Sequence, residues 1–165
     1  CGIVSLLTVD CISVSRISHP ADRFSAGEYI PVVVRTIDRE HDRIFVTHRE
    51  LLGTWEENAA AFSPTETVSG IVRSVEDYGI FVELAPNLAG LAEYKSGVRV
   101  GDTASVYIKS MIPQRMKIKL VLIDSYPALP APTKRKYFID TNTVKHLDRW
   151  LYSPPGCAKV IETVF

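Results

Sequence analysis

Residues 70–84 form the sequence Gly-Ile-Val-Arg-Ser-Val-Glu-Asp-Tyr-Gly-Ile-Phe-Val-Glu-Leu, which predicts two β-strands joined by a short turn. In the second half the residues alternate, so that Ile80 and Val82 share one face of a strand while Phe81 lies on the other. Tyr78 precedes this strand at the turn. Aromatic side chains exposed on a curved sheet are a common platform for stacking unpaired bases. The alternative is that a neighbouring segment covers Phe81.

The composition limits the class of protein. The chain has 165 residues, of which 46% are hydrophobic and 23% charged, and its formal net charge is zero. These values are ordinary for a folded domain and argue against a highly basic, chromatin-type binder, while leaving room for local basic patches. The sequence contains no long apolar run that predicts a membrane span. Three cysteines without paired spacing favour a reduced, cytoplasmic setting.

Three further strands are predicted after the opening pair. Their approximate bounds are Asn87–Ala92, Thr103–Lys109 and Lys117–Val121. Five short strands separated by turns favour a small closed barrel over an open sheet. The alternation directs cations and aromatics outward, at Arg73, Phe81, Tyr107, Lys109, Lys117 and Lys119. Sequence-tolerant binding of single strands requires this combination, because cations neutralise phosphates and aromatics stack on bases.

An internal repeat relates the two halves of the chain. Gly27–Arg35 aligns with Gly101–Lys109, and a basic-Ile pair follows each run, at Arg43-Ile44 and Lys117-Ile118. A repeated supersecondary unit favours tandem copies of one fold. The first copy has the later strands of the unit but lacks the two that should precede them. We therefore expect an all-β fold of tandem five-stranded barrels, the first incomplete, in a fragment of a longer polypeptide.

A short helix is predicted between the two units. Thr54 and Glu57 form a capping-box pattern, and apolar residues at helical spacing extend the helix from Trp55 to about Phe62. The expected division is residues 1–52 for the C-terminal part of a first barrel, 53–63 for the linker helix, 64–125 for a complete barrel, and 126–165 for a proline-rich linker and a small α/β tail.

The tail is expected to contain a strand at Tyr137–Ile139, a helix at Thr143–Tyr152 and a strand at Val160–Phe165. A half barrel leaves unpaired strand edges and an exposed core. The two tail strands are candidates to cover that core, and oligomerisation through the open edge is the alternative. The sequence does not determine the oligomeric state.

The motifs of the second unit resemble those of the S1-type RNA-binding domain. They occur in order as Gly70-x-Val72, Tyr78-Gly79-Ile80-Phe81-Val82, Gly90-Leu91, Gly101-Asp102 and the basic-Ile pair. The resemblance covers about residues 64–124 and implies the five-stranded oligonucleotide-binding barrel, while residues 1–52 resemble the second part of another such domain. Arrays of these repeats joined by short helices are typical of the ribosomal members of the family. The run from His48 to Leu91, especially Glu50–Asn58, is similar to S1-like proteins of clostridial bacteria.

The resemblance also implies which residues hold RNA. Family members use two aromatics around the second strand, a histidine or other polar residue after the third, and an acid and a base on the last hairpin. Tyr78 and Phe81 match the aromatics, and Lys117 matches the base. Glu93 stands at the histidine position, and Pro113 stands where the acid is expected.

The first copy matches the acid and base positions with Asp38 and Arg43, so Arg43 completes the expected RNA-binding set. We expect non-catalytic binding of single-stranded RNA, including mRNA, by an S1-like translation protein, with the small ribosomal subunit as a further candidate partner. The rival is a degenerate barrel that serves as a protein-docking module, favoured by Glu93, Pro113 and the zero net charge. No enzyme, metal site or cofactor is expected, because the four histidines have no nucleophile or metal-ligand spacing.

Overall fold

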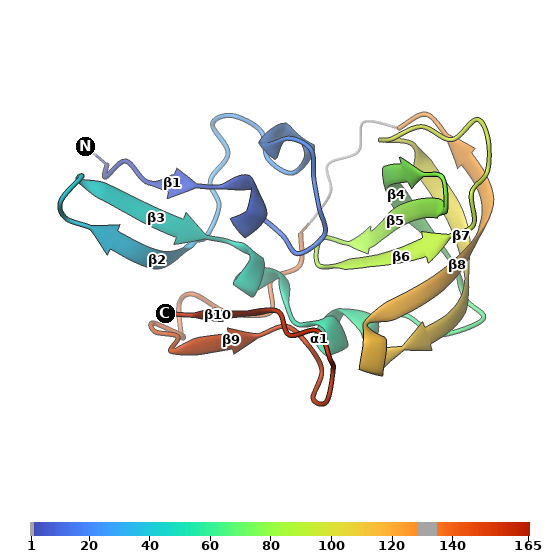
Figure 1. The fold of residues 1–165 in the computed structure, drawn as a ribbon. Coiled ribbons are helices and arrows are strands. Elements are labelled where there is room, and N and C mark those ends of the chain that lie inside the picture. Colours follow the sequence, from blue (N-terminus) through green and yellow to red (C-terminus); the bar gives the residue numbers. More distant parts are fainter. Residues whose placement is uncertain (1, 129–134) are drawn as a thin grey trace.

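The chain folds around a closed five-stranded barrel with the strand order β4-β5-β6-β8-β7 (Figure 1). The computed structural model describes residues 2–128 and 135–165, so Cys1 and part of the expected proline-rich linker lie outside the described residues. The barrel strands are β4 (Thr67–Glu76), β5 (Gly79–Ala85), β6 (Leu88–Ala92), β7 (Thr103–Ile112) and β8 (Lys117–Tyr126). β6 and β8 are parallel, and the other neighbours are antiparallel. The predicted closed barrel is confirmed.

Alternating apolar residues fill the barrel, as a period of two predicts. The fully buried members include Val72, Ile80, Val82, Val106 and Ile108. Gly90 allows β6 to approach β8 closely, because a Cβ atom there would lie 2.6 Å from Leu120 Cδ1 and 3.0 Å from the Ile118 carbonyl oxygen. The glycine of the Gly90-Leu91 motif is therefore required by strand packing.

The N-terminal unit is an open sheet of three strands, β1 (Leu6–Leu7), β2 (Val33–Asp38) and β3 (Arg43–Thr47), in the order β1-β3-β2. β1 is parallel to β3, as β6 is to β8 in the barrel. β2 is antiparallel to β3, as β7 is to β8. The register agrees too: Val34 pairs with Val46 directly before a bulge, and Ile108 pairs with Leu120 directly before a bulge. The sequence repeat is thus a structural repeat. Within the described residues one copy closes, and the other is an open sheet without the first two strands of the unit, as the incomplete repeat predicts; a second closed barrel is not shown.

The open sheet leaves its apolar face uncovered. By the alignment of the repeat, Val32 and Val34 occupy the positions of Val106 and Ile108. The two barrel residues are 0% exposed, whereas Val32 is 39% and Val34 is 52% exposed. In the barrel, β4 pairs with β7 on one side and with β5 on the other, and β5 pairs with β6. The described part of the N-terminal unit has no strands equivalent to β4 and β5.

Helix α1 (Trp55–Ala59) connects the two units. The Thr54 hydroxyl accepts a hydrogen bond from the Glu57 amide at 3.2 Å, and the Glu57 carboxylate accepts one from the Thr54 amide at 3.1 Å. The predicted capping box is therefore present. The helix ends before the expected Phe62, because a turn follows at Ala60.

The tail is a β-hairpin and lacks the expected helix. Its strands are β9 (Arg149–Leu151) and β10 (Glu162–Val164), which pair antiparallel. The prediction of a helix at Thr143–Tyr152 is wrong because the burial follows a period of two: Trp150 and Tyr152 are buried while Leu151 between them is exposed. The predicted strand at Tyr137–Ile139 is also wrong, since those residues form no strand.

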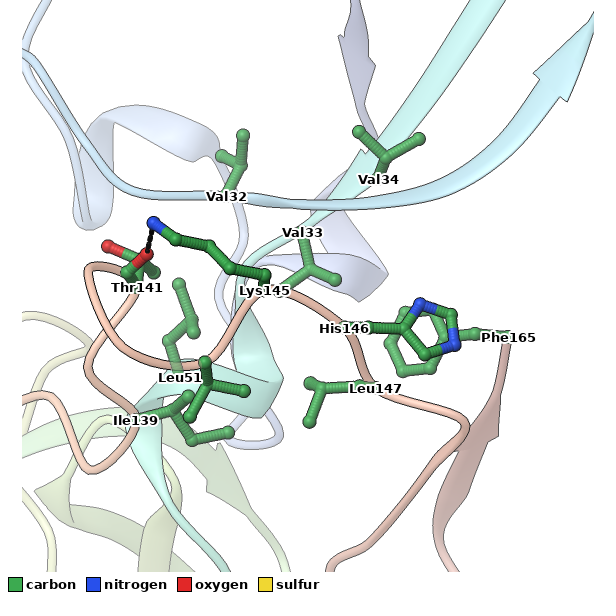
Figure 2. Close-up of a pocket in the computed structure, with 11 residues that line it drawn as sticks. Val32, Val33, Val34, Leu51, Ile139, Thr141, Lys145, His146, Leu147 and Phe165 are labelled. Carbon is green, nitrogen blue, oxygen red and sulfur yellow. Dashed lines mark hydrogen bonds between the residues drawn. The ribbon is translucent and has the colours of Figure 1, made fainter.

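The tail packs against the linker and one side of the N-terminal sheet. The Phe138 amide donates a hydrogen bond to the Leu51 carbonyl oxygen at 2.9 Å. A cavity of about 340 Å³ lies between β2 and the tail, and Figure 2 shows Val33 pointing into it while Val32 and Val34 point away. The described part of the tail therefore leaves the apolar face of the open sheet uncovered, so the first of the two candidate coverings is wrong.

Asn87 lies where the N-terminal unit, the barrel and the tail meet. Its side-chain oxygen accepts from the Val14 amide at 2.9 Å, and its side-chain nitrogen donates to the carbonyl oxygens of Arg49 and Gly53, each at 2.8 Å. The Tyr152 hydroxyl donates to the Asn87 carbonyl oxygen. Asn87 is completely buried. A fully satisfied buried polar group thus holds the three parts of the chain together.

Candidate nucleic-acid interface

A groove of about 600 Å³ lies on the barrel where the β4–β5 turn, the end of β6, and strands β7 and β8 come together. We call it the barrel groove. Its charged and aromatic lining residues are Tyr78, Glu93, Tyr94, Lys95, Lys109 and Lys119. Leu91 and Val121 contribute apolar surface between them. The groove therefore offers rings, cations and an apolar surface in one place.

Strand pairing explains why these side chains meet. Phe81 on β5 pairs with Leu91 on β6, and Leu91 pairs with Lys119 on β8, so the three lie in one row across the sheet. The neighbours Ile80 and Leu120 point into the core, which directs this row outward. Lys109 occupies the bulge of β7 beside this row. A bulge re-aims the side chain of the extra residue, and here it brings a second lysine to the groove.

Two aromatic rings meet at the edge of the groove. Tyr78 and Phe81 pack edge to face, with ring centroids 6.1 Å apart and an interplanar angle of 83°. Tyr78 is 69% exposed, and Phe81 is half-buried. Because Phe81 supports the Tyr78 ring from the side, the exposed face of Tyr78 is held ready for a stacking partner.

The groove carries an excess of positive charge although the chain as a whole is neutral. Its three lysines face a single carboxylate, that of Glu93. Lys109 and Lys119 are exposed, and neither forms an ion pair with another residue of the described ranges. Lys95 Nζ lies 3.4 Å from the Ile123 carbonyl oxygen. The ammonium groups of Lys109 and Lys119 are therefore available to bind anionic ligands.

The structure separates the other predicted site residues from the barrel groove. Arg73 donates from Nε to the Glu83 carboxylate at 2.8 Å, in a largely buried ion pair whose side chains are 12% and 4% exposed. Tyr107 is half-buried and pairs with Val121 next to the groove. Lys117 is exposed at the start of β8, and Arg43 belongs to β3 of the N-terminal unit. Of the predicted set, the groove thus gathers Tyr78, Lys109 and Lys119, with Phe81 beside them.

Sequence reasoning missed two groove residues. Tyr94 and Lys95 follow Glu93, the first residue after β6, and Tyr94 is 55% exposed. The signal that points to them is an aromatic next to a cation, placed two residues after the end of a predicted strand. The described ranges contain no group of three or more His, Cys, Asp or Glu side chains arranged to hold a metal ion. In the same ranges, no helix has the length and apolarity needed to cross a membrane.

Three relatives share sequence with most of this chain. The chain is 27% identical over 132 residues to small ribosomal subunit protein bS1 of Chlamydia muridarum, covering 72% of this chain and 23% of that protein. It is 30% identical over 123 residues to the bS1 homolog of Bacillus subtilis, covering 73% and 31%. It is 31% identical over 129 residues to bS1 of Staphylococcus aureus, covering 74% and 32%. The family-level resemblance is to bS1.

The bS1-like chain spans less than a third of the length of each of these three relatives, whose covered shares are 23%, 31% and 32%. No protein-family model matches it. The similarity to bS1 confirms the resemblance that the barrel motifs indicate, and the closed barrel with its parallel β6–β8 pair agrees with it.

Proposed function

We propose that this chain binds single-stranded RNA through the barrel groove, without catalysis, as part of a bS1-like protein that works in translation. The observation that carries the proposal is the convergence of Lys95, Lys109 and Lys119 with the exposed rings of Tyr78 and Tyr94. Relatives named as small ribosomal subunit proteins support a role at the small ribosomal subunit. We propose mRNA as the RNA that the chain binds.

The groove chemistry suits modest, sequence-tolerant binding. Lysines that neutralise phosphates release counterions, and this makes affinity fall as salt rises. Each base stacked on an aromatic ring contributes about 1–3 kcal/mol as measured by substitution. Two tyrosines and three lysines give only a few such contacts. Tight binding then requires several barrels acting together on one strand, which raises the effective concentration of each site.

A second candidate function is docking of a protein partner. The observation that favours it is the uncovered apolar face of the N-terminal sheet, where Val34 is 52% exposed and Ile37 is 59% exposed. Exposed apolar patches commonly mark interaction sites. Glu93 in the groove and Pro113 at the β7–β8 turn also fit a barrel with weak RNA affinity.

Fluorescence anisotropy of a labelled single-stranded RNA, at low and moderate salt, tests the RNA-binding proposal. Tyr78→Ala should weaken binding about fivefold or more, because a stacked base is lost. Tyr29→Ala is the matched control, since Tyr29 is fully exposed on the N-terminal unit and outside the barrel groove. Equal affinities of the two variants would contradict binding in the groove. Absence of binding at low salt would favour the docking function.

A further inference from the structure

Glu93 is the one carboxylate among the residues that line the barrel groove. It is exposed and follows Ala92, the last residue of β6. Within the described ranges its carboxylate accepts no hydrogen bond and forms no ion pair, although Lys95, Lys109 and Lys119 line the same groove. The Glu93 carboxylate can therefore accept a hydrogen bond from a donor group of a ligand, which the lysines cannot do.

A carboxylate accepts hydrogen bonds and donates none, whereas lysine only donates. Near a phosphate, Glu93 is repulsive. Near the edge of a base, the effect depends on the base. Cytosine presents an exocyclic amino group that donates to a carboxylate, whereas uracil presents a carbonyl oxygen at the equivalent position. Single-stranded RNA exposes these edges because its bases are unpaired.

The surroundings of Glu93 favour contact with a base over contact with the backbone. Tyr94 is its neighbour in sequence, and Tyr78 lies in the same groove, so both flat stacking surfaces are near the carboxylate. An unpaired base that stacks on an aromatic ring keeps its polar edges free to hydrogen-bond with the protein. The three lysines are then free to meet the phosphates on either side.

We propose that Glu93 gives the barrel groove a preference for bases that present an amino group, so that cytosine is bound more tightly than uracil. This inference rests on the proposed RNA-binding function. We expect a preference of at least about fivefold, the low end of the discrimination that specific base-edge contacts give.

The experiment compares labelled oligocytidylate and oligouridylate of equal length by anisotropy at one salt concentration. The wild-type chain should bind the cytidine oligomer at least about fivefold more tightly. In Glu93→Gln the ratio should fall to about one, because the amide can donate to the uracil carbonyl as well as accept from cytosine. Glu40→Gln is the matched control, since Glu40 is exposed in the β2–β3 turn and outside the groove.

The outcomes separate this inference from the proposed function. Equal binding of the two oligomers by the wild-type chain would overturn the inference and leave RNA binding intact. A cytosine preference that persists in Glu93→Gln would also overturn it, because the discrimination would then arise from another group. Failure of both oligomers to bind would overturn the proposed function and the inference together.

Discussion

The guanidinium of Arg23 and the carboxylate of Glu83 form a bidentate ion pair between the N-terminal unit and the barrel. Nη1 lies 2.6 Å from Oε1, Nη2 lies 2.9 Å from Oε2, and both side chains are 4% exposed. Arg73 adds a third hydrogen bond to the same carboxylate, from within the barrel. Glu83 thus lies on the outward face of β5, as the alternation predicts, but the N-terminal unit buries it.

Loss of this ion pair should destabilise the chain strongly. Arg23→Ala leaves the buried Glu83 carboxylate with Arg73 as its remaining charged partner, and breaking a buried pair typically costs about 3–5 kcal/mol. Urea denaturation should show a lower midpoint at an unchanged slope. Arg16→Ala, at an exposed position, is the control. A shift no larger than that of the control would show that the units do not depend on this contact.

The buried contact between Tyr152 and Asn87 should hold the tail in place. Burial raises the pKa of the Tyr152 hydroxyl above its usual value, so the hydroxyl stays protonated and donates to the Asn87 carbonyl oxygen. Tyr152→Phe leaves that oxygen unsatisfied, at a cost of about 1–3 kcal/mol. Thermal unfolding monitored by circular dichroism measures the loss. Tyr126→Phe, where the ring is 40% exposed, should change stability little; equal effects would contradict the role of the hydroxyl.

Stability should fall as the solution becomes mildly acidic. Burial holds the pKa of His48 below its ordinary value of 6.5, while Nδ1 donates to the Pro31 carbonyl oxygen and the ring packs against Phe24 and Tyr137. Because the unfolded chain binds the proton more readily, the free energy of unfolding decreases as pH falls below about 6.5.

Urea denaturation between about pH 5.5 and 7.5 measures this dependence. His48→Gln should flatten the pH dependence, whatever its effect on stability at neutral pH. His146→Gln, at an exposed histidine, should leave the slope as in the wild-type chain. An unchanged slope in His48→Gln would assign the pH dependence to other groups.

Lys119 should contribute to the salt dependence of RNA binding. If it neutralises one phosphate, Lys119→Ala lowers the slope of log affinity against log salt by about 0.7, the value for a single strand. A titration over several salt concentrations gives this slope. Lys159→Ala is the control, because Lys159 is exposed in the tail and absent from the barrel groove. Weaker binding with an unchanged slope would mean that Lys119 contacts a base instead.

The barrel was predictable because its strands obey local rules. The alternation after Gly79 predicts which residues are buried, and the structure places Ile80 and Val82 at 0% exposure. The repeat was equally informative, since it predicts two copies of one strand unit, and the structure gives both copies the same pairing before a bulge, at Val34 and Ile108. These signals lie within a few residues of the elements they describe.

The fold of the tail and the composition of the barrel groove could not be predicted, because they depend on contacts between residues far apart in the sequence. The helix predicted in the tail is wrong although Val144, Leu147 and Leu151 fit one helical face. Pairing between Trp150 and Thr163 places this segment in a strand instead. Arg73 looked like a free cation, and only the folded chain shows Glu83 next to it. In the groove, Tyr94 and Lys95 lie two and three residues beyond the end of β6, where no strand periodicity specifies the direction of a side chain.

The junction at Asn87 determines how the molecule comes apart. The amides of Val14 and Trp55 both bond across it, to the Asn87 side chain and to the Tyr152 carbonyl oxygen. Neither amide can exchange its proton with solvent until the junction opens. Opening it breaks hydrogen bonds of the N-terminal unit and of the tail in one event. In deuterated water these two amides should therefore exchange at matching rates, as a single cooperative unit that spans all three parts of the chain.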